Sequence, residues 1–372
     1  MSYEEKSLPH DVIIEILSWL PPETLLKFKR VCRSWCSIIT TRDAKFVAIH
    51  QSHFGNSLQD MNCGRIVIAR EKYKRAFLYL KLRLVQERNP RRIVHMNMEL
   101  RIPNTRYFRD HYRIIGSCNG VFCYASFRVD NAPIQLCNPS MRWAYLVPPY
   151  RFGNNLKFPF INACYGVGFD RFVNDYKVLK FVSKDGEAAA AAIYSMKTKS
   201  WKRLTNDSVQ LPKSLWCLPL SVFLGGFIHW LGYKAKTWTR TIMLFHVCNE
   251  VFGEMQLPAA VLESRHDNIY HISISVVKGS LCLLVEELTD DHKGIWQVWT
   301  MKEYGVAESW IKQRKVVLGE RIMMTTIQLT VGGKILCSNY KSQKLFLYDP
   351  ETDKYQYVGL GSSFSCSLVA SL

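Results

Sequence analysis

The residue types that commonly perform catalysis are present in this chain but are not arranged for it. His229 stands with Trp230 beside the Gly225-Gly226 pair, where a turn would expose a general base. Nucleophilic catalysis would also need a Ser or Cys in a sharp elbow sequence and an acidic residue that orients the histidine. The sequence around His229 offers neither. We therefore expect His229 to be a packed strand residue, with no catalytic residues in the chain and no enzyme activity of its own.

Cysteine and glycine spacing give no indication of a metal or nucleotide site. The twelve cysteines are scattered, and even a close pair such as Cys32 and Cys36 lacks a second Cys or His pair at ligand spacing. Reduced, mostly buried thiols are the simpler expectation. The Gly166-x-Gly168 motif lacks the third glycine, the lysine and the following helix of a phosphate-binding loop, so we expect a β turn there. We expect no metal and no cofactor.

Positive charge is concentrated between residues 65 and 113, where fourteen Lys or Arg face four Asp or Glu. Aromatic residues lie among these charges, a pattern that suits stacking on single-stranded nucleic acid. The same segment also alternates like strands over residues 65–70 and 76–84. We expect strands with basic solvent faces and no nucleic-acid partner. A basic RNA-associated protein that uses residues 65–113 remains the alternative hypothesis.

Composition indicates an ordered protein with a small module and one large domain. The chain has 372 residues, a formal net charge of +18 and 48% hydrophobic residues. No apolar run approaches the roughly 18 residues of a membrane helix. Glu4, Glu5 and Lys6 do not resemble the start of a signal peptide. We expect a soluble protein without membrane partners, located in the cytoplasm, the nucleus or both.

The first fifty residues predict three short helices with more apolar surface than they can bury. Pro9 suits a helix start, and Pro21-Pro22 suits the end of one helix and the start of the next. Such a small helical piece is marginal alone and needs a partner to cover its apolar face. The first helix carries one stripe at helical spacing: Val12, Ile13, Ile16, Leu17 and Leu20.

The rest of the chain predicts an all-β domain built from a degenerate repeat. A glycine followed by a short apolar strand recurs at Gly120, Gly226, Gly279 and Gly333, which suits a positive φ in a tight turn. A second recurring motif predicts a β-hairpin whose return strand carries an aromatic residue. These aromatics step by 58, 51, 58 and 45 residues, close to the roughly 40 to 50 residues of a propeller blade. They are Trp143, Trp201, Phe252, Trp310 and Tyr355.

The predicted fold is therefore an α+β multidomain chain, with a three-helix module followed by a propeller-like domain. Five blades show the hairpin phrase, and the strands of residues 65–84 are candidates for a sixth. We place the boundaries at 1–50 for the helices, 51–113 for a basic connecting segment and 114–372 for the β domain. A β-sandwich, or two smaller β domains, is the alternative.

The helical segment resembles the F-box over residues 8 to about 50. The resemblance is carried by Leu8-Pro9, Ile16-Leu17, Leu20-Pro21, Leu25-Leu26 and Val31-Cys32-Arg33-Ser34-Trp35. Cys32 replaces the commoner Ser, a conservative departure. In that family the helices dock on a Skp-type adaptor, which connects to the cullin and RING subunits of a ubiquitin ligase. Position by position, the resemblance implies these adaptor contacts: Leu8, Pro9, Ile13, Ile16, Leu17, Leu20, Pro21, Val31, Cys32 and Trp35.

The β domain resembles the kelch-like F-box-associated interaction domain of plant F-box proteins, from Gly116 to about Gly361. The matching phrases, in order, are Gly116-Ser117-Cys118-Asn119-Gly120, Asn138-Pro139-Ser140-Met141-Arg142 with Pro148-Pro149, Gly166-Val167-Gly168-Phe169-Asp170 with Asn174-Asp175-Tyr176-Lys177-Val178, and Val298-Trp299-Thr300-Met301 with Ser309-Trp310. The resemblance implies that this domain selects an unknown protein substrate for ubiquitination and proteasomal degradation.

The partner of the β domain is less constrained. One subgroup with this layout, the S-locus F-box proteins, engages basic ribonucleases in pollen self-incompatibility, and membership in it stays open. The +18 charge fits a basic target poorly, and Glu286-Glu287 with Asp290-Asp291 is the one compact acidic cluster, which we expect to be a solvated loop. Loop position and side-chain type suggest five substrate contacts: Arg151, Phe152, Trp216, Trp238 and His266.

Overall fold

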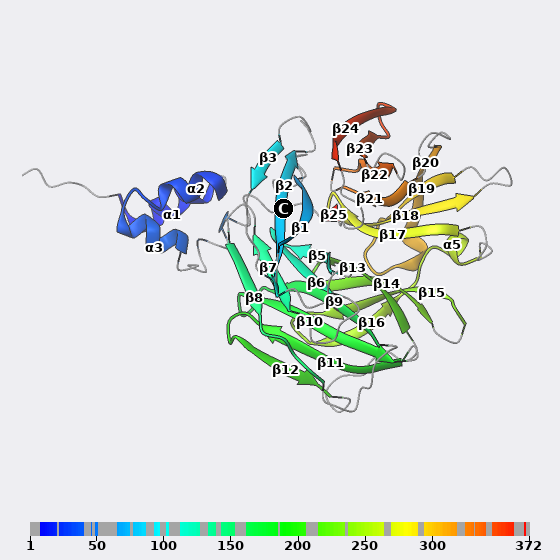
Figure 1. Cartoon of the computed structure of the whole chain (residues 1–372), viewed down its shortest axis with the longest axis horizontal. Coiled ribbons are helices and arrows are strands. Elements are labelled where there is room, and N and C mark those ends of the chain that lie inside the picture. The colour runs from blue at the N-terminus through cyan, green and yellow to red at the C-terminus, as the bar shows by residue number, and fades with distance from the viewer. Residues whose placement is uncertain are drawn as a thin grey trace, which may run out of the picture.

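A computed structural model of the chain shows three N-terminal helices beside a set of β-sheets that follow one another around the molecule (Figure 1). The structure describes residues 8–20, 22–40, 46, 49–50, 65–74, 77–86, 93–96, 102–103, 112–126, 133–138, 143–152, 161–184, 187–205, 215–234, 237–263, 269–288, 294–317, 324–330, 332–339, 344–360 and 368–369.

The helices are α1 (His10–Ser18), α2 (Pro22–Phe28) and α3 (Arg33–Thr40). Pro9 occupies the N-cap of α1, where its missing N–H costs nothing, and Pro22 opens α2. The backbone of Leu20 donates to Leu17 O over 3.1 Å and closes the last turn of α1. The predicted helix starts at Pro9 and Pro22 are therefore confirmed, and Pro21 lies outside the described residues.

Five four-stranded antiparallel sheets form the blades, numbered here in chain order. Blade 1 contains β5 (Tyr112–Cys118), β6 (Val121–Ser126), β7 (Ile134–Asn138) and β8 (Trp143–Val147). Blade 2 contains β9 (Ile161–Asp170), β10 (Asp175–Lys184), β11 (Glu187–Ser195) and β12 (Ser200–Leu204). Blade 3 contains β13 (Leu215–Leu224), β14 (Phe227–Lys234), β15 (Arg240–His246) and β16 (Val251–Met255).

Blade 4 contains β17 (Ile269–Val277), β18 (Ser280–Leu288), β19 (Gly294–Met301) and β20 (Trp310–Val317). Blade 5 contains β21 (Met324–Leu329), β22 (Ile335–Asn339), β23 (Lys344–Asp349) and β24 (Lys354–Leu360). The helix α5 (Ala259–Glu263) follows blade 3, and a 3-10 turn, η1 (Ala307–Ser309), precedes β20. The first strand of each blade contacts the first strand of the next, so these strands are innermost. This arrangement is a β-propeller, and the sandwich alternative was wrong.

A further sheet joins the two ends of the β region. It contains β1 (Arg65–Lys74), β2 (Phe77–Gln86), β3 (Ile93–Met96) and β4 (Ile102–Pro103), with β25 (Leu368–Val369) paired to β1. The strands predicted over residues 65–84 are therefore confirmed. The pairing of β25 with β1 ties the last described strand to the first, which leaves fewer open sheet edges.

The glycine phrase marks the turn between the first two strands of four blades, as predicted. The φ angles are +76° at Gly120, +87° at Gly226, +76° at Gly279 and +86° at Gly333. Residues with a Cβ rarely adopt a positive φ angle, because the Cβ meets neighbouring backbone atoms. Glycine avoids this strain at each turn.

The hairpin aromatics lie on the outermost strand of each blade, also as predicted. Two of them make equivalent bonds to the preceding blade. Trp201 Nε1 donates to Pro148 O over 2.7 Å, and Trp310 Nε1 donates to Gln256 O over 3.1 Å. Each accepting carbonyl follows the outermost strand of the neighbouring blade, so the repeated aromatic links consecutive blades.

The hydrophobic core lies between blades rather than at one centre. Four clusters of buried side chains each combine two consecutive blades: 1 with 2, 2 with 3, 3 with 4, and 4 with 5. A four-stranded sheet has two faces, and stacking against a neighbour removes both from water. The blades therefore stabilise one another.

The prediction of a β turn at Gly166-x-Gly168 was wrong, because both glycines lie inside strand β9. Their role is close packing. A Cβ at Gly166 would meet Trp230 and would lie 2.6 Å from Ile228 Cγ2. Trp230 of blade 3 is fully buried there, and its Nε1 donates to Tyr165 O over 2.8 Å. Glycine at this position admits the neighbouring indole.

His229 is buried on β14, which confirms the prediction of a packed strand residue. Its Nδ1 lies 3.3 Å from Val222 O, and its Nε2 lies 2.7 Å from the hydroxyl of Tyr304 in blade 4. A carbonyl can only accept, so Nδ1 carries the proton and Nε2 accepts from Tyr304. Burial lowers the pKa of His229 to about 4.

Two other local predictions have mixed outcomes. The alanine-rich run was predicted to enter a strand instead of a helix, and β11 (Glu187–Ser195) confirms this. Glu286 and Glu287 were expected in a solvated loop but lie within β18, while Asp290 and Asp291 are outside the described residues. Burial raises the pKa of Glu286 to about 7, and Glu287 accepts a hydrogen bond from Gln297.

We predict that Gly166→Ala destabilises the protein by roughly 1 to 3 kcal/mol, because the added methyl group overpacks the boundary between blades 2 and 3. Chemical denaturation of the full chain measures the effect. Gly253→Ala is the matched control, since its Cβ would meet only the flexible end of Leu244 at 2.8 Å. Equal stability changes in the two variants would contradict the packing role of Gly166.

We predict that His229 makes stability fall as the pH is lowered. Its folded pKa of about 4 lies below the ordinary value of 6.5, so the unfolded chain binds the proton more tightly. Between pH 7.5 and 5 this difference removes about 2 kcal/mol of unfolding free energy. Chemical denaturation at several pH values over this range measures the unfolding free energy. We expect this free energy to change less with pH for His229→Gln than for the wild type. The same pH dependence of the unfolding free energy in both proteins would show that His229 does not contribute to it.

Candidate functional site

The three helices have a small core of their own. Phe28 and Trp35 pack at its edge with ring centroids 5.4 Å apart, and His50 Nε2 lies 3.1 Å from Leu20 O. This core holds α1 against α2 and α3. Its buried members are Ile14, Leu17, Leu25, Ile38, Ile39 and Phe46.

A second set of apolar side chains points away from this core. Within α1 and its C-cap, Val12, Ile16 and Trp19 fall at helical spacing on one face, and Trp19 Nε1 donates to Glu15 Oε1 over 3.0 Å. Exposed large hydrophobic groups gathered on so small a module mark an interaction surface. The set, called here the exposed helical face, has between 41% and 60% of each side chain exposed and contains Leu8, Val12, Ile16, Trp19 and Val31.

The predicted adaptor contacts divide by burial. Leu17 is fully buried in the helical core, so its prediction as a contact is corrected: it is turned toward α2 and α3. Pro21 lies outside the described residues. The remaining eight stay predictions: Leu8, Pro9, Ile16, Val31 and Cys32 are exposed, and Ile13, Leu20 and Trp35 are half-buried.

Val12 and Trp19 belong to the exposed helical face but were absent from the predicted contacts. Val12 was recognisable from its place in the apolar stripe, one turn before Ile16. Trp19 lies one turn after Ile16, where the sequence signal was its helical spacing.

The predicted substrate contacts on the β domain do not gather into one site. Arg151 is exposed, and so is Trp238 in the connection between β14 and β15. Phe152 is only 6% exposed and belongs to the core between blades 1 and 2, so its prediction as a surface contact was wrong. The Trp216 side chain and His266 lie outside the described residues.

Phe152 is buried because it helps to enclose a lysine. Lys180 Nζ donates to Tyr150 O over 2.6 Å and lies 5.3 Å from the centre of the Phe152 ring. A buried ammonium group needs such partners to offset its lost hydration. This arrangement is structural, since Lys180 is itself buried.

Ion pairs connect blades 2 and 3 near their turns. Lys177 Nζ lies 2.9 Å from Asp170 Oδ2 and 3.3 Å from Glu250 Oε1, and Lys202 Nζ lies 2.7 Å from Glu250 Oε2. Burial alone would raise the pKa of Asp170, but hydrogen bonds from Lys177 and Cys248 outweigh it and lower the pKa. The charges are mutually satisfied, which suits an inter-blade link better than catalysis.

The described residues supply no metal-binding group of three or more His, Cys, Asp or Glu side chains. The ten cysteines in the described ranges are free thiols, and six of them are buried. None of the helices in these ranges combines the length and hydropathy that a membrane crossing requires.

Comparison with known families supports both halves of this architecture. A model described as "F-box domain" matches residues 6–46, which include the three helices. A model described as "F-box associated beta propeller domain" matches residues 71–369, more than half of the chain.

Several F-box proteins of Arabidopsis thaliana are similar to this chain at 24% to 27% identity. F-box protein CPR1 is 27% identical over 69% of this chain and 67% of its own length. F-box protein At3g07870 is 24% identical over 94% of this chain and 87% of its own length. F-box/kelch-repeat protein At3g23880 is 25% identical over 83% of this chain and 79% of its own length. The chain therefore belongs to the F-box proteins that carry an F-box associated β-propeller domain.

Proposed function

We propose that this protein is a substrate-recognition subunit of a Skp-cullin-F-box ubiquitin ligase. The exposed helical face binds a Skp-type adaptor, which brings the cullin and RING subunits. The propeller binds a target protein, which is ubiquitinated and degraded by the proteasome. The observation that carries the proposal is the exposed apolar face on a module whose own core is already complete.

The helices divide their apolar residues between folding and binding. Leu17 and Leu25 fill the core, so Val12, Ile16 and Trp19 are not needed to hold the helices together. Full burial of a large apolar side chain is worth about 1.5 to 3 kcal/mol, so a few such residues support a stable complex. Contact with an adaptor removes them from water.

The proposed role requires no catalytic group in this chain. Holding a substrate close to a recruited conjugating enzyme raises the effective concentration of its lysines. The buried polar groups described above serve structural contacts, in keeping with a non-catalytic receptor. We place this activity in the cytoplasm, the nucleus or both.

Charge bears on the class of target. A chain with a net charge of +18 repels basic partners over distances of about a Debye length, so an S-locus-type role toward basic ribonucleases receives no support from electrostatics. An acidic target gains from the same field.

We predict that the double variant Val12→Glu with Ile16→Glu binds a purified Skp-type adaptor roughly 100-fold more weakly than the wild type, or more weakly still. Both side chains are exposed, so the helices should remain folded. Isothermal titration with the full-length protein measures the affinity, and circular dichroism checks the fold.

The matched control is Val251→Glu with Ile311→Glu. These residues lie on outer propeller strands and are 44% and 42% exposed, against 41% and 45% for Val12 and Ile16. The control should bind the adaptor like the wild type. Absence of adaptor binding by correctly folded wild-type protein would refute the proposed function.

A further inference from the structure

A groove of about 460 Å³ lies between blades 4 and 5. Its walls come from the turn between β17 and β18, the segment after β19, the turn between β21 and β22, and the turn between β23 and β24. In a propeller blade, the first and third turns open on the same end of the ring, so these four segments meet on one end. The groove is large enough for a few amino-acid side chains.

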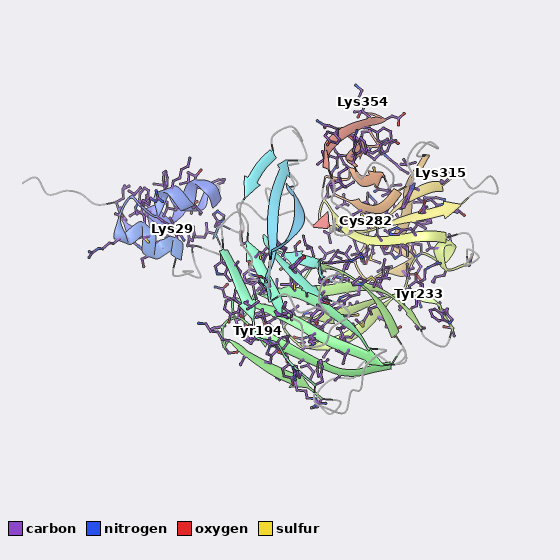
Figure 2. All side chains as sticks on the ribbon, in the orientation of Figure 1. Lys29, Tyr194, Tyr233, Cys282, Lys315 and Lys354 are labelled. Carbon is purple, nitrogen blue, oxygen red and sulfur yellow. The ribbon has the colours of Figure 1, made fainter. Side chains whose placement is uncertain are left out.

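The floor of the groove is neutral. Cys282 on β18, labelled in Figure 2, is buried, and its Sγ lies 3.2 Å from Thr300 Oγ1. Val298 and Leu329 complete the floor with apolar side chains. The charged side chains of the groove lining therefore lie on its rim.

Two cations on the rim are already paired. Lys334 Nζ lies 3.3 Å from Asp349 Oδ2, and Arg314 Nη2 lies 3.9 Å from Glu351 Oε1. Arg314 Nη1 also donates to Pro350 O over 2.8 Å. These pairs use both carboxylates in the groove lining.

Lys278 and Lys302 are the other two cations of the lining, and both are exposed. Within the described part of the chain, neither side chain has an ion-pair partner. Lys278 has a left-handed turn conformation with φ +49°, and Lys302 N donates to Ser309 O over 3.1 Å. The groove therefore carries two positive charges that no acidic side chain of the described residues pairs with.

We propose that this groove binds an acidic peptide segment of the target protein, with Lys278 and Lys302 pairing with its carboxylate or phosphate groups. The inference rests on the proposed function and names the chemistry of the substrate contact. It agrees with the net charge of +18, which attracts acidic partners at long range.

The test uses the full-length protein and a fluorescein-labelled hexaglutamate peptide, with hexaglutamine as the uncharged probe. Fluorescence anisotropy should show binding of hexaglutamate only, weakened when sodium chloride rises from 50 to 300 mM. The double variant Lys278→Gln with Lys302→Gln should bind roughly three- to tenfold more weakly, since partly exposed ion pairs contribute modestly.

Lys199→Gln with Lys315→Gln is the matched control. It removes the same charge, Lys199 also occupies a turn with positive φ at +54°, and neither residue lines the groove; Lys315 on β20 is labelled in Figure 2. This control should bind within twofold of the wild type. Equal losses in the two double variants would overturn the proposal, because general basic charge would then explain the binding.

Competition distinguishes the two kinds of acidic group. Displacement of hexaglutamate by inorganic phosphate at far lower concentration than by acetate indicates a phosphorylated segment, and similar displacement by both indicates carboxylates. Absence of hexaglutamate binding at 50 mM sodium chloride would overturn the proposal. So would tighter binding of a six-nucleotide uridine RNA that depends on Lys278 and Lys302, because the ligand would then be a nucleic acid.

Measuring adaptor binding of the same protein preparations distinguishes a failure of this inference from a failure of the proposed function. Lys278→Gln with Lys302→Gln should bind the adaptor like the wild type. Loss of peptide binding with adaptor binding intact is the expected result. Wild-type protein that binds the peptide through the groove but no adaptor would refute the ligase role and leave the groove as an acidic-peptide site.

Discussion

The stacking of each blade on the next is the interaction on which the rest of this structure depends. A four-stranded sheet cannot bury both of its faces alone, so every hydrophobic cluster of the described propeller is shared by two blades. The contact of Trp230 with Gly166 shows how closely these faces approach. Polar contacts such as Trp201 to Pro148 and His229 to Tyr304 join the same boundaries. These contacts connect the five blades in chain order.

The unusual polar groups of this protein serve structural contacts. Lys180, Lys177 and His229 would each attract attention as catalytic candidates if found alone. Each is instead satisfied by partners, and one partner of Lys177 and one of His229 lie in a neighbouring blade. The two surfaces that we propose for binding are an apolar one on the helices and a charged one between blades 4 and 5. These surfaces suit different partners, because one gains from desolvation and the other from charge pairing.

Turns and hairpins were predictable from the sequence where residues within the same short segment cause them. The glycine turns were found because Gly120 and its equivalents need positive φ, and the hairpin aromatics because their spacing repeats. Errors occurred where a neighbouring element decides the outcome. Gly166 was taken for a turn residue although its reason is the indole of Trp230, sixty-four positions later. Phe152 was taken for a surface residue although it covers Lys180.

The sequence by itself determined the three helices, the run of hairpins and the positive charge, because periodicity, turn chemistry and composition are properties of short segments. Tertiary structure alone decided which side chains remain available to a partner. Ile16 and Leu17 are adjacent and equally apolar, yet α2 and α3 cover only Leu17. Lys278 and Lys302 are ordinary lysines in the sequence; the sheet of blade 4 brings them to the same groove, and the acidic residues of blade 5 that line it, Asp349 and Glu351, pair with other cations. Exposure and charge balance depend on neighbours distant in the chain, which no local pattern specifies.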